Sequence, residues 1–328
     1  MSTWLVTGGA GYIGAHVVRA FREVGTDVVV VDDLSSGHEE FVPDDVPFVR
    51  ASILDEPAVT AAMTEHRVVG VVHLAGFKYA GVSVQRPLHT YEQNVTGTAR
   101  VLSAMRAAGV PSIVFSSSAA VYGTPETEHV IEKTPTMPES PYGESKLVGE
   151  WLIRDLARAT ADSATPLRCT ALRYFNVVGS GYVDIEDTSP HNLFPLVLDA
   201  LQEGRTPRIY GTDYPTPDGT CVRDYVGVAA LARAHVAAAA ALESGLPLEP
   251  VYNLGSGDGI SVRQIMDAVA EVTGIAFEPE LAPRRPGDPA RIVADGSLAA
   301  RDLDWTMNHD VRELVRTAWA ARRARDSR

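Results

Sequence analysis

A glycine-rich turn between two short apolar stretches constrains the fold of this chain more than any other feature. Residues 4–7 have the composition of a buried strand, residues 8–14 read Gly-Gly-Ala-Gly-Tyr-Ile-Gly, and residues 16–21 begin a helical pattern. A second apolar strand follows at residues 27–32. This order of strand, glycine turn, helix and strand is the fingerprint of dinucleotide binding, because the glycines let the backbone approach a pyrophosphate at the helix N-terminus. The fingerprint therefore predicts a parallel sheet that begins with a cofactor site.

The acid that ends the second strand indicates which dinucleotide binds. Asp32 lies roughly 20 residues after the glycines, where an acid hydrogen-bonds the adenosine ribose. A carboxylate at this place repels a 2′-phosphate. The sequence therefore predicts NAD rather than NADP. A glycine turn alone is often only structural, but the strands, helix and acid around it favour the cofactor site.

The alternation of strands and helices continues beyond this unit. We expect further strands at residues 46–49, 68–75, 112–115 and 167–176, with helices at 56–66, 91–108 and 142–161. This pattern predicts the fold class α/β, a doubly wound, Rossmann-like parallel sheet, with a smaller mixed α/β substrate domain at the C-terminal end. We expect residues 1–176 to form the NAD-binding domain, segments near 222–256 to return to it, and residues 177–328 to form mainly the substrate domain. Residues 177–190 are rich in Gly, Ser and Asp and read as a loop.

Charge and composition narrow the partners and the location. The net charge of −13 argues against binding to nucleic acid or anionic lipid. No apolar run reaches the length of a membrane span, and the N-terminus lacks a secretory signal. The two cysteines, Cys169 and Cys221, have no metal-like spacing. We therefore expect a cytoplasmic protein with no metal, no nucleic acid and no membrane among its partners.

Tyr142 and Lys146 are candidates for acid–base chemistry. They are four residues apart on a predicted helix and so share one face. An ammonium beside a phenol favours the phenolate and lowers the pKa of the phenol, which would give a base near neutral pH. Taken alone, such a pair is more typical of the edge of a surface helix. A run of serines at 116–118 ends the preceding strand, at the sheet edge where α/β proteins bind ligands.

With these motifs assembled, the chain resembles the extended short-chain dehydrogenase/reductase superfamily and, within it, the UDP-glucose 4-epimerase family. In the first half the resemblance rests on TGGAGYIG at 7–14, VDDLSSG at 31–37, HLAGFK at 73–78, NVTGT at 94–98, FSSSAAVYG at 115–123, SPYGESK at 140–146 and LRYFNVVG at 172–179. In the second half it rests on IYGTDYPTPDGTCVRDY at 209–225, YNLGSG at 252–257 and APRRPGD at 282–288. Residues 214–225 are the most specific of these and point to a 4-epimerase.

The resemblance implies roles for individual residues. Tyr142 would be the base, Lys146 would lower its pKa and hold the nicotinamide ribose, and Ser118 would bridge to the sugar 4-hydroxyl. The implied NAD-binding residues are Gly8, Gly11, Tyr12, Ile13, Gly14, Asp32, Asp33, Leu34, Ser35, Ser36, Gly37, Ser52, Ile53, Leu74, Ala75, Gly76, Lys78, Asn94, Ser116, Tyr142, Lys146, Tyr174 and Phe175. The implied UDP-sugar-binding residues are Lys78, Ser118, Tyr142, Phe175, Asn176, Asn192, Leu193, Arg208, Ile209, Tyr210, Arg223, Tyr225, Arg285 and Asp288.

The resemblance further implies a homodimer, paired through helices near 91–108 and 142–160, that interconverts UDP-galactose and UDP-glucose. The sugar would be oxidised transiently at carbon 4 by NAD, and the 4-keto sugar would turn and be reduced on its other face. Arg223 and Arg285 are forked donors suited to a diphosphate. Binding energy placed on the nucleotide would leave the hexose free to turn.

Other functions share this scaffold. Nucleotide-sugar 4,6-dehydratases usually carry an Asp-Glu pair after the catalytic hydroxyl, where Ala119 and Ala120 stand here. Other NAD-dependent epimerases act on UDP-N-acetylhexosamines or UDP-uronates. Binding or redox-sensing relatives keep the fold but often lose the tyrosine or the lysine, and both residues are present in this chain.

The chain departs from the family pattern at several positions. Ser52 stands where an Asp commonly reaches the adenine, and Val82 replaces a Glu in the segment 81–84. Ala120 replaces a common Thr. Arg291 stands about where a Tyr or a small residue governs acceptance of N-acetylated sugars, so the choice between a hexose and an N-acetylhexosamine stays open.

Overall fold

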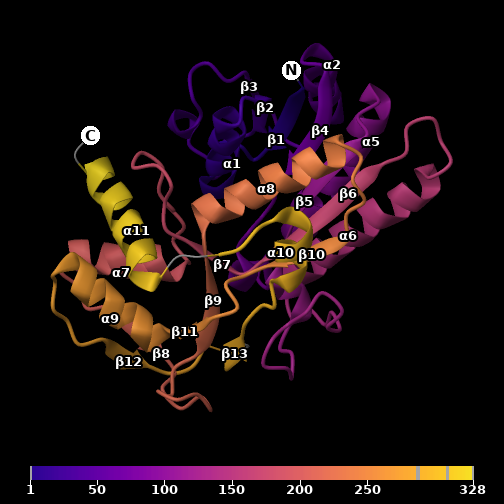
Figure 1. Ribbon diagram of the computed structural model, residues 1–328. Helices are drawn as coiled ribbons and strands as arrows, with labels where there is room; N and C mark the ends of the chain where they lie inside the picture. Colours follow the sequence, from indigo (N-terminus) through magenta and orange to yellow (C-terminus); the bar gives the residue numbers. More distant parts are fainter. Residues whose placement is uncertain (1, 286–288, 308–309, 327–328) are drawn as a thin grey trace.

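A seven-stranded parallel sheet forms the centre of the structure, a computed structural model that describes residues 2–285, 289–307 and 310–326 (Figure 1). Its strand order is β10-β6-β5-β4-β1-β2-β3, and every pairing is parallel. The strands are β1 (Thr3–Thr7), β2 (Asp27–Asp32), β3 (Phe48–Arg50), β4 (Val68–His73), β5 (Ser112–Ser118), β6 (Arg168–Tyr174) and β10 (Val251–Leu254). The direction of winding reverses between β1 and β4, which is the place where such sheets bind ligands. The predicted fold class is confirmed.

Helices cover both faces of this sheet (Figure 1). One face packs against α1 (Tyr12–Glu23) and α8 (Val228–Glu243), and the other against α2 (Glu56–Glu65), α5 (Gly97–Ala108) and α6 (Pro141–Thr160). Alternate residues of a strand point to opposite faces of the sheet: Val28 and Val30 face α1, while Val29 and Val31 face the layer that contains α2. Burial on both faces explains why these strands are continuously apolar.

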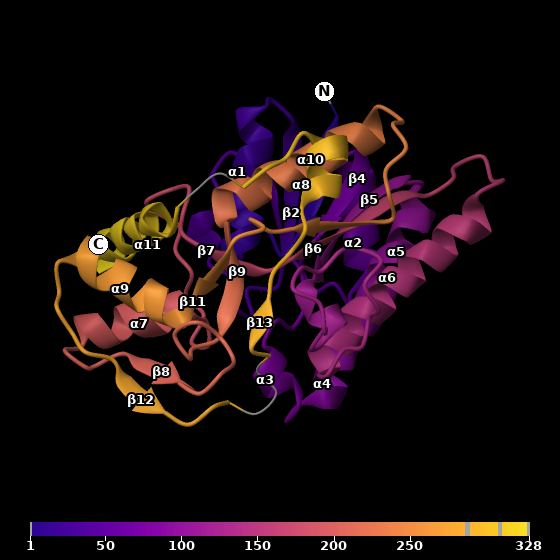
Figure 2. The same ribbon diagram turned by 60° about the horizontal axis from the view of Figure 1, so that its bottom comes forward.

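A four-stranded sheet and a two-stranded sheet lie beside the main sheet (Figure 2). The first contains β11 (Gly259–Ser261), β9 (Val222–Gly227), β13 (Arg291–Ile292) and β7 (Asn176–Val178), and the second contains β12 (Glu280–Ala282) and β8 (Arg208–Tyr210). The helices on this side are α7 (Leu193–Gln202), α9 (Val262–Thr273), α10 (Ser297–Leu303) and α11 (Val311–Asp326). Ser261 caps α9 in a capping box with Gln264.

The segment near 222–256 is divided between the two sheets. Helix α8 packs on the main sheet and β10 pairs with β6, whereas β9 pairs with β7, β11 and β13 in the smaller sheet. Residues 177–190 were predicted as loop throughout, but β7 extends into them as far as Val178. These differences arise from long-range pairing, which short strands do not signal in their own sequence.

The predicted helix over 91–108 is interrupted. The chain forms α3 (Ala80–Ser83), α4 (Pro87–Tyr91), a π-helical turn η2 (Glu92–Thr96) and only then α5. Two short 3₁₀ helices, η1 (Glu39–Phe41) and η3 (Ala119–Tyr122), complete the elements of the described residues. A π-helical turn widens the helix locally and is frequently found at functional sites. In this turn it carries Asn94.

Among the residues that the structure describes, no helix has both the length and the apolar character needed to cross a membrane. In the same residues no group of three or more His, Cys, Asp or Glu side chains could hold a metal ion.

Candidate active site

A cavity of about 1650 Å³ lies at the carboxyl edge of the main sheet and extends to the smaller sheets. Pockets for a single drug-sized ligand have volumes of roughly 300–1,000 Å³. This cavity can therefore take a dinucleotide together with a second ligand of nucleotide size. It joins the glycine turn after β1 at one end to β8 and Arg285 at the other, with the first turn of α6 between them.

Tyr142 and Lys146 lie in the first turns of α6, and both line the cavity. Helix α6 begins here because Ser140 caps it, its Oγ accepting from the Gly143 N–H at 3.2 Å, and Pro141 occupies the first turn. Ser118, at the end of β5, lines the same part of the cavity and shares a hydrogen bond with Tyr142. The structure therefore brings together the three residues that the motifs singled out.

Burial changes the acid–base properties expected of this pair. The prediction that Lys146 lowers the pKa of Tyr142 is wrong for this geometry: burial raises the pKa of the Tyr142 phenol above its usual value, and only the hydrogen bond with Ser118 opposes the rise. The Lys146 Nζ donates to the Ser116 carbonyl at 2.8 Å and lies 5.9 Å from the centre of the Tyr142 ring. Burial also lowers the pKa of Lys146 to about 8, which weakens its hold on a phenolate.

At the cofactor end of the cavity, two glycines of the turn have no space for a side chain. A Cβ on Gly14 would lie 2.0 Å from the Gly8 carbonyl oxygen, and one on Gly8, whose φ is +73°, would lie 2.8 Å from the Ala75 nitrogen. Asp32 lines the cavity, and its carboxylate accepts from the N–H groups of Ala10 at 3.0 Å and Leu34 at 2.8 Å. Burial raises the pKa of Asp32 above its usual value, although these two N–H donors oppose the rise.

Most of the predicted cofactor residues line this end of the cavity. They are Gly8, Gly11, Tyr12, Ile13, Gly14, Asp32, Asp33, Ser35, Ser36, Gly37, Ile53, Leu74, Ala75, Gly76, Lys78, Tyr142, Lys146, Tyr174 and Phe175. Leu34, Ser52, Asn94 and Ser116 do not line it. Sequence spacing places a residue near a strand end, but it does not fix the direction in which the side chain points.

Two of these four residues support the cavity wall from behind. The Asn94 amide oxygen accepts from the Phe77 N–H at 2.6 Å, and its Nδ2 donates to the Phe77 carbonyl at 3.0 Å and the Ser145 Oγ at 2.8 Å. Asn94 thus ties the loop after β4 to α6. The Ser116 Oγ lies 3.0 Å from the Nε2 of His235 on α8. The Ser116 carbonyl accepts the hydrogen bond from the Lys146 Nζ.

A buried ion pair holds α6 on the sheet one turn beyond Lys146. The Arg173 Nε donates to one Glu150 carboxylate oxygen at 2.8 Å and its Nη2 donates to the other at 2.5 Å. The Ser117 hydroxyl donates to the same carboxylate at 2.5 Å. Ser117 and Arg173 adjoin Ser118 and Tyr174, which both line the cavity. The pair therefore fixes the register between α6, β5 and β6.

The substrate end is formed by separate segments of chain. Of the residues predicted there beyond those shared with the cofactor, Asn176, Asn192, Leu193, Arg208, Tyr210, Arg223, Tyr225 and Arg285 line the cavity. Ile209 does not, because alternation along β8 turns it into the core, where it is fully buried. Asp288 lies outside the described residues.

Two arginines at this end are oriented by contacts of their own. The Arg223 Nη1 donates to the Pro289 carbonyl at 2.7 Å and to the carbonyl of Val222 at 2.9 Å. The Arg285 guanidinium lies 4.1 Å above the centre of the Tyr210 ring, within the range of a cation–π interaction. Both guanidinium groups are thus held at the cavity wall, where they could bind a diphosphate.

The sequence analysis missed Asp187, Ser189, His191 and Tyr79, which also line the cavity. The Asp187 carboxylate accepts from the Asn192 Nδ2 at 2.7 Å and from the Ser189 N–H at 3.0 Å. Burial raises the pKa of Asp187 above its usual value. An acid within a Gly- and Ser-rich loop reads as solvated, so the sequence carried no signal of this burial.

Of the four positions that depart from the family pattern, the structure places one in the cavity wall and three outside it. Ala120 lines the cavity, whereas Ser52, Val82 and Arg291 do not. Arg291 begins β13 and pairs with Val222 of β9.

Comparisons with known proteins agree with this geometry. Residues 4–255 match the NAD dependent epimerase/dehydratase family. The chain is 41% identical over 319 residues to a UDP-glucose 4-epimerase of Corynebacterium glutamicum, covering 96% of this chain and 94% of that protein.

Solved structures extend the likeness to the whole fold. A crystal structure of UDP-glucose 4-epimerase superposes with a TM-score of 0.94 at 37% identity, covering 99% of this chain and 98% of the other. A second, from Stenotrophomonas maltophila with bound NAD and formylated UDP-arabinopyranose, gives 0.93 at 37% identity and covers 100% and 99%. The resemblance drawn from the motifs is confirmed. The chain belongs to the NAD dependent epimerase/dehydratase family.

Proposed function

We propose that this protein is an NAD-dependent UDP-glucose 4-epimerase, which interconverts UDP-galactose and UDP-glucose. The observation that carries the proposal is a single cavity that contains the pair of Tyr142 and Ser118 between a glycine turn and two arginines. The family membership and the near full-length likeness to UDP-glucose 4-epimerases support the same activity.

The glycine turn and Asp32 fit NAD. Positions 8 and 14 admit no side chain, as the tight turn and the close packing of helix on strand in a dinucleotide-binding unit require. The Asp32 carboxylate is fixed by two backbone N–H donors and lines the cavity, where it can accept from the adenosine ribose. NAD, when bound, supplies an acceptor and donor of hydride for sugar carbon 4 and, in its oxidised form, a positive charge that favours a phenolate.

Tyr142 removes the proton from the sugar 4-hydroxyl, directly or through Ser118, and returns it when the sugar is reduced. Because burial raises the pKa of Tyr142, positive charge must stabilise its phenolate. The oxidised nicotinamide would supply this charge, because Lys146 donates to the Ser116 carbonyl and does not lower the pKa of Tyr142. Lys146, which lines the cavity, would instead hold the nicotinamide ribose. Ser118 contributes through its hydrogen bond, which lowers the pKa of Tyr142.

Arg223 and Arg285 hold the diphosphate, which does not react. The hexose is held loosely between this anchor and Tyr142, so the 4-keto sugar can turn over and present its other face. Anchoring a non-reacting part of the substrate uses binding energy without hindering this rotation. Ala119 and Ala120 line the cavity beside Ser118 and offer no acid for the water elimination of a 4,6-dehydratase.

We also propose the assembly and the domain roles. Residues 1–176 would bind NAD, with α8 and β10 of the segment near 222–256 added to them, and residues 177–328 would mainly bind the UDP-sugar. Two copies would associate in the cytoplasm through α5 and α6. Trp151 on α6 is 45% exposed and would offer an aromatic side chain at this surface. Light scattering of the purified protein tests the dimer.

The activity is tested by incubating the protein with UDP-galactose and, in a separate reaction, with UDP-N-acetylgalactosamine, and then separating the products. We expect UDP-glucose from the first reaction without steady release of NADH, since the cofactor is regenerated in each cycle. The second reaction establishes whether N-acetylated sugars are accepted. Absence of interconversion in both reactions would overturn the proposal, and steady NADH production would indicate a net oxidoreductase.

A further inference from the structure

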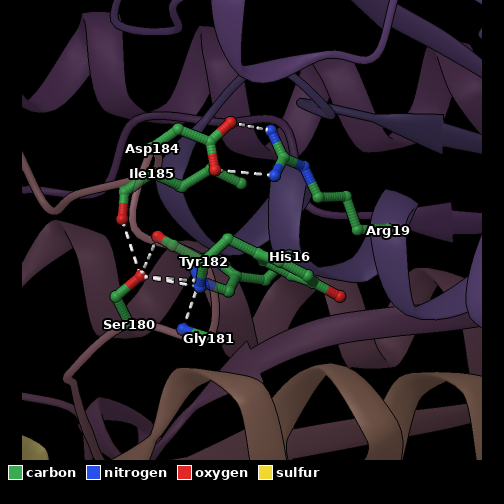
Figure 3. Close-up of polar contacts among 7 residues, drawn as sticks. All are labelled: His16, Arg19, Ser180, Gly181, Tyr182, Asp184 and Ile185. Carbon is green, nitrogen blue, oxygen red and sulfur yellow. Dashed lines mark hydrogen bonds and ion pairs between the residues drawn. The ribbon is translucent and has the colours of Figure 1, made fainter. Parts of the chain in front are cut away.

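Residues 179–192, called the strap here, run from β7 to the start of α7 along one side of the cavity. The sequence reads as a plain loop, but the structure attaches it closely to α1 (Figure 3). Four residues of α1, at positions 12, 16, 19 and 23, share one helix face because their spacings are four, three and four. Each of them bonds to the strap.

The first two anchors lie next to the glycine turn. The Tyr12 hydroxyl donates to the Gly179 carbonyl at 2.6 Å. The His16 Nε2 accepts from the Gly181 N–H at 2.9 Å (Figure 3). The Nδ1 of the same ring lies 2.8 Å from the Tyr12 carbonyl. This pattern requires a neutral ring with its proton on Nδ1. Burial lowers the pKa of His16 to about 4, so the ring is neutral at neutral pH.

The third anchor is the most strongly bonded. The Arg19 guanidinium binds both oxygens of Asp184, one of them at 2.8 Å (Figure 3). It also lies 4.8 Å from the centre of the Tyr182 ring, and the Tyr182 hydroxyl donates to Glu23. A forked guanidinium–carboxylate pair fixes direction as well as distance.

Helix α11 holds the strap from its other side. The Thr317 Oγ1 accepts from the Ser180 N–H at 3.1 Å. The buried Glu186 carboxylate forms ion pairs with Arg322 at 3.0 Å and Arg325 at 2.6 Å. The first part of the strap is thus fixed between α1 and α11 before it reaches the cavity.

The second part of the strap crosses the cofactor end. The Thr188 Oγ1 lies 3.1 Å from the Nε2 of His38, which follows β2, and the His191 ring is 4.8 Å from the ring of Tyr79, which follows β4. In the sheet, β1 lies between β2 and β4. The strap therefore spans the glycine turn that follows β1. Asp187 and Ser189 line the cavity along this crossing.

We propose that the strap retains NAD by closing over the pyrophosphate, and that Arg19 and His16 are positioning residues that hold it there. This inference rests on the proposed function, since an epimerase that regenerates its cofactor gains from keeping it bound. The crossing places a band of chain over the turn where a dinucleotide enters. A band anchored at both sides slows the escape of a ligand without touching its reacting end.

The test is the rate at which the NAD-loaded protein exchanges bound NAD for isotope-labelled NAD. Arg19→Met removes the forked pair, and we expect exchange to become roughly tenfold faster, the size expected for the loss of one charged interaction of this kind. Arg22→Met is the matched control on the same helix, because Arg22 pairs with Asp45 and Asp27 on the surface and does not touch the strap. Its exchange rate should equal that of the unmodified protein.

Thr188→Val tests the crossing independently of α1. It keeps the size of the side chain but removes the hydrogen bond with His38. Exchange should again be faster, while the first-order rate of epimerisation at saturating NAD changes little. If both Thr188→Val and folded Arg19→Met exchange NAD at the rate of the unmodified protein, the inference is overturned. It is also overturned if Arg22→Met accelerates NAD exchange as much as Arg19→Met does. A protein that binds NAD but does not epimerise would overturn only the proposed activity.

Discussion

The glycine turn and the segments that carry Arg223 and Arg285 stand at opposite ends of one cavity, but they are held in different ways. At the cofactor end, Asp32 is fixed by two backbone N–H donors, and the turn is so tight that a Cβ on Gly14 would meet the Gly8 oxygen at 2.0 Å. At the substrate end, the strand pair β8 and β12 stands apart from the other sheets. A two-stranded sheet has little stability of its own.

Ion pairs repeat the contrast. Arg208 and Glu280 join β8 to β12 with side chains that are 57% and 53% exposed, and pairs so exposed contribute about 0–1 kcal/mol. On the cofactor side, Arg19 and Asp184 are 19% and 29% exposed, and Glu150 and Arg173 are 8% and 6% exposed. The difference matches the task that we propose for each end: the cofactor end keeps its ligand through many cycles, while the substrate end releases a product in each cycle.

The most disruptive test of this contrast is Gly14→Ala. Because the new Cβ has no space against the Gly8 backbone, we expect the turn to open and NAD binding to be lost. Gly25→Ala is the control at the other end of α1, where φ is +76° and no atom lies within 4 Å of the Cβ. Because a residue with a Cβ is strained in this left-handed conformation, this substitution should cost about 1 kcal/mol of folding stability without affecting NAD binding. NAD content after gel filtration and thermal unfolding measure the two effects; normal NAD binding by Gly14→Ala would refute a rigid cofactor end.

Tyr142→Phe separates chemistry from binding at both ends. Removal of a general base typically lowers kcat by a factor of roughly 10²–10⁴. The phenyl ring preserves the packing at the first turn of α6, so the NAD exchange rate and the KM for UDP-galactose should stay near their normal values. Activity near that of the unmodified protein would eliminate Tyr142 as the base.

The sequence predicts the cofactor end of the cavity better than the substrate end. The cofactor end comes from consecutive strand ends at one edge, so the βαβ fingerprint located Gly8, Gly14 and Asp32 correctly at the cavity. The substrate end comes from segments whose pairing is long-range. The sequence alone therefore did not reveal β7, the membership of β9 in the smaller sheet or the place of Asp187 in the cavity wall.

Errors at single residues have physical causes of their own. Ile209 turns away from the cavity because side chains alternate along β8. Asn94 lies behind the wall, where its amide bonds to Phe77 and Ser145. The expected lowering of the pKa of Tyr142 failed because burial outweighs a lysine that bonds to a carbonyl instead. The motifs located residues that the structure brings together at one cavity, whereas their electrostatics depend on packing that only the fold supplies.

Acid should weaken the main sheet. Burial lowers the pKa of His16 and His235 to about 4 and that of His73 to about 3. Each binds a proton more readily when unfolded, so its stabilising effect is complete above pH 6.5 and is lost as the pH falls towards the lowered pKa. From pH 6.5 to 5 this amounts to about 2 kcal/mol per histidine. Urea unfolding at both pH values measures the loss; equal stability would contradict the neutral state of these rings.

The smallest expected effect belongs to Arg223→Met, and it bears most directly on the independence of the two ends. Methionine keeps much of the buried volume but removes a donor for the diphosphate. We expect the KM for UDP-galactose to rise roughly tenfold with kcat nearly unchanged, the pattern for loss of uniform binding. Arg223→Lys keeps the positive charge but not the forked pair of donors. Its KM should therefore lie between those of the unmodified protein and Arg223→Met. If the two ends are independent, NAD exchange stays at its normal rate in both variants. Faster exchange would mean that β9 transmits strain from the substrate to the cofactor, since Arg223 lies on the strand that pairs with β7, from which the strap begins.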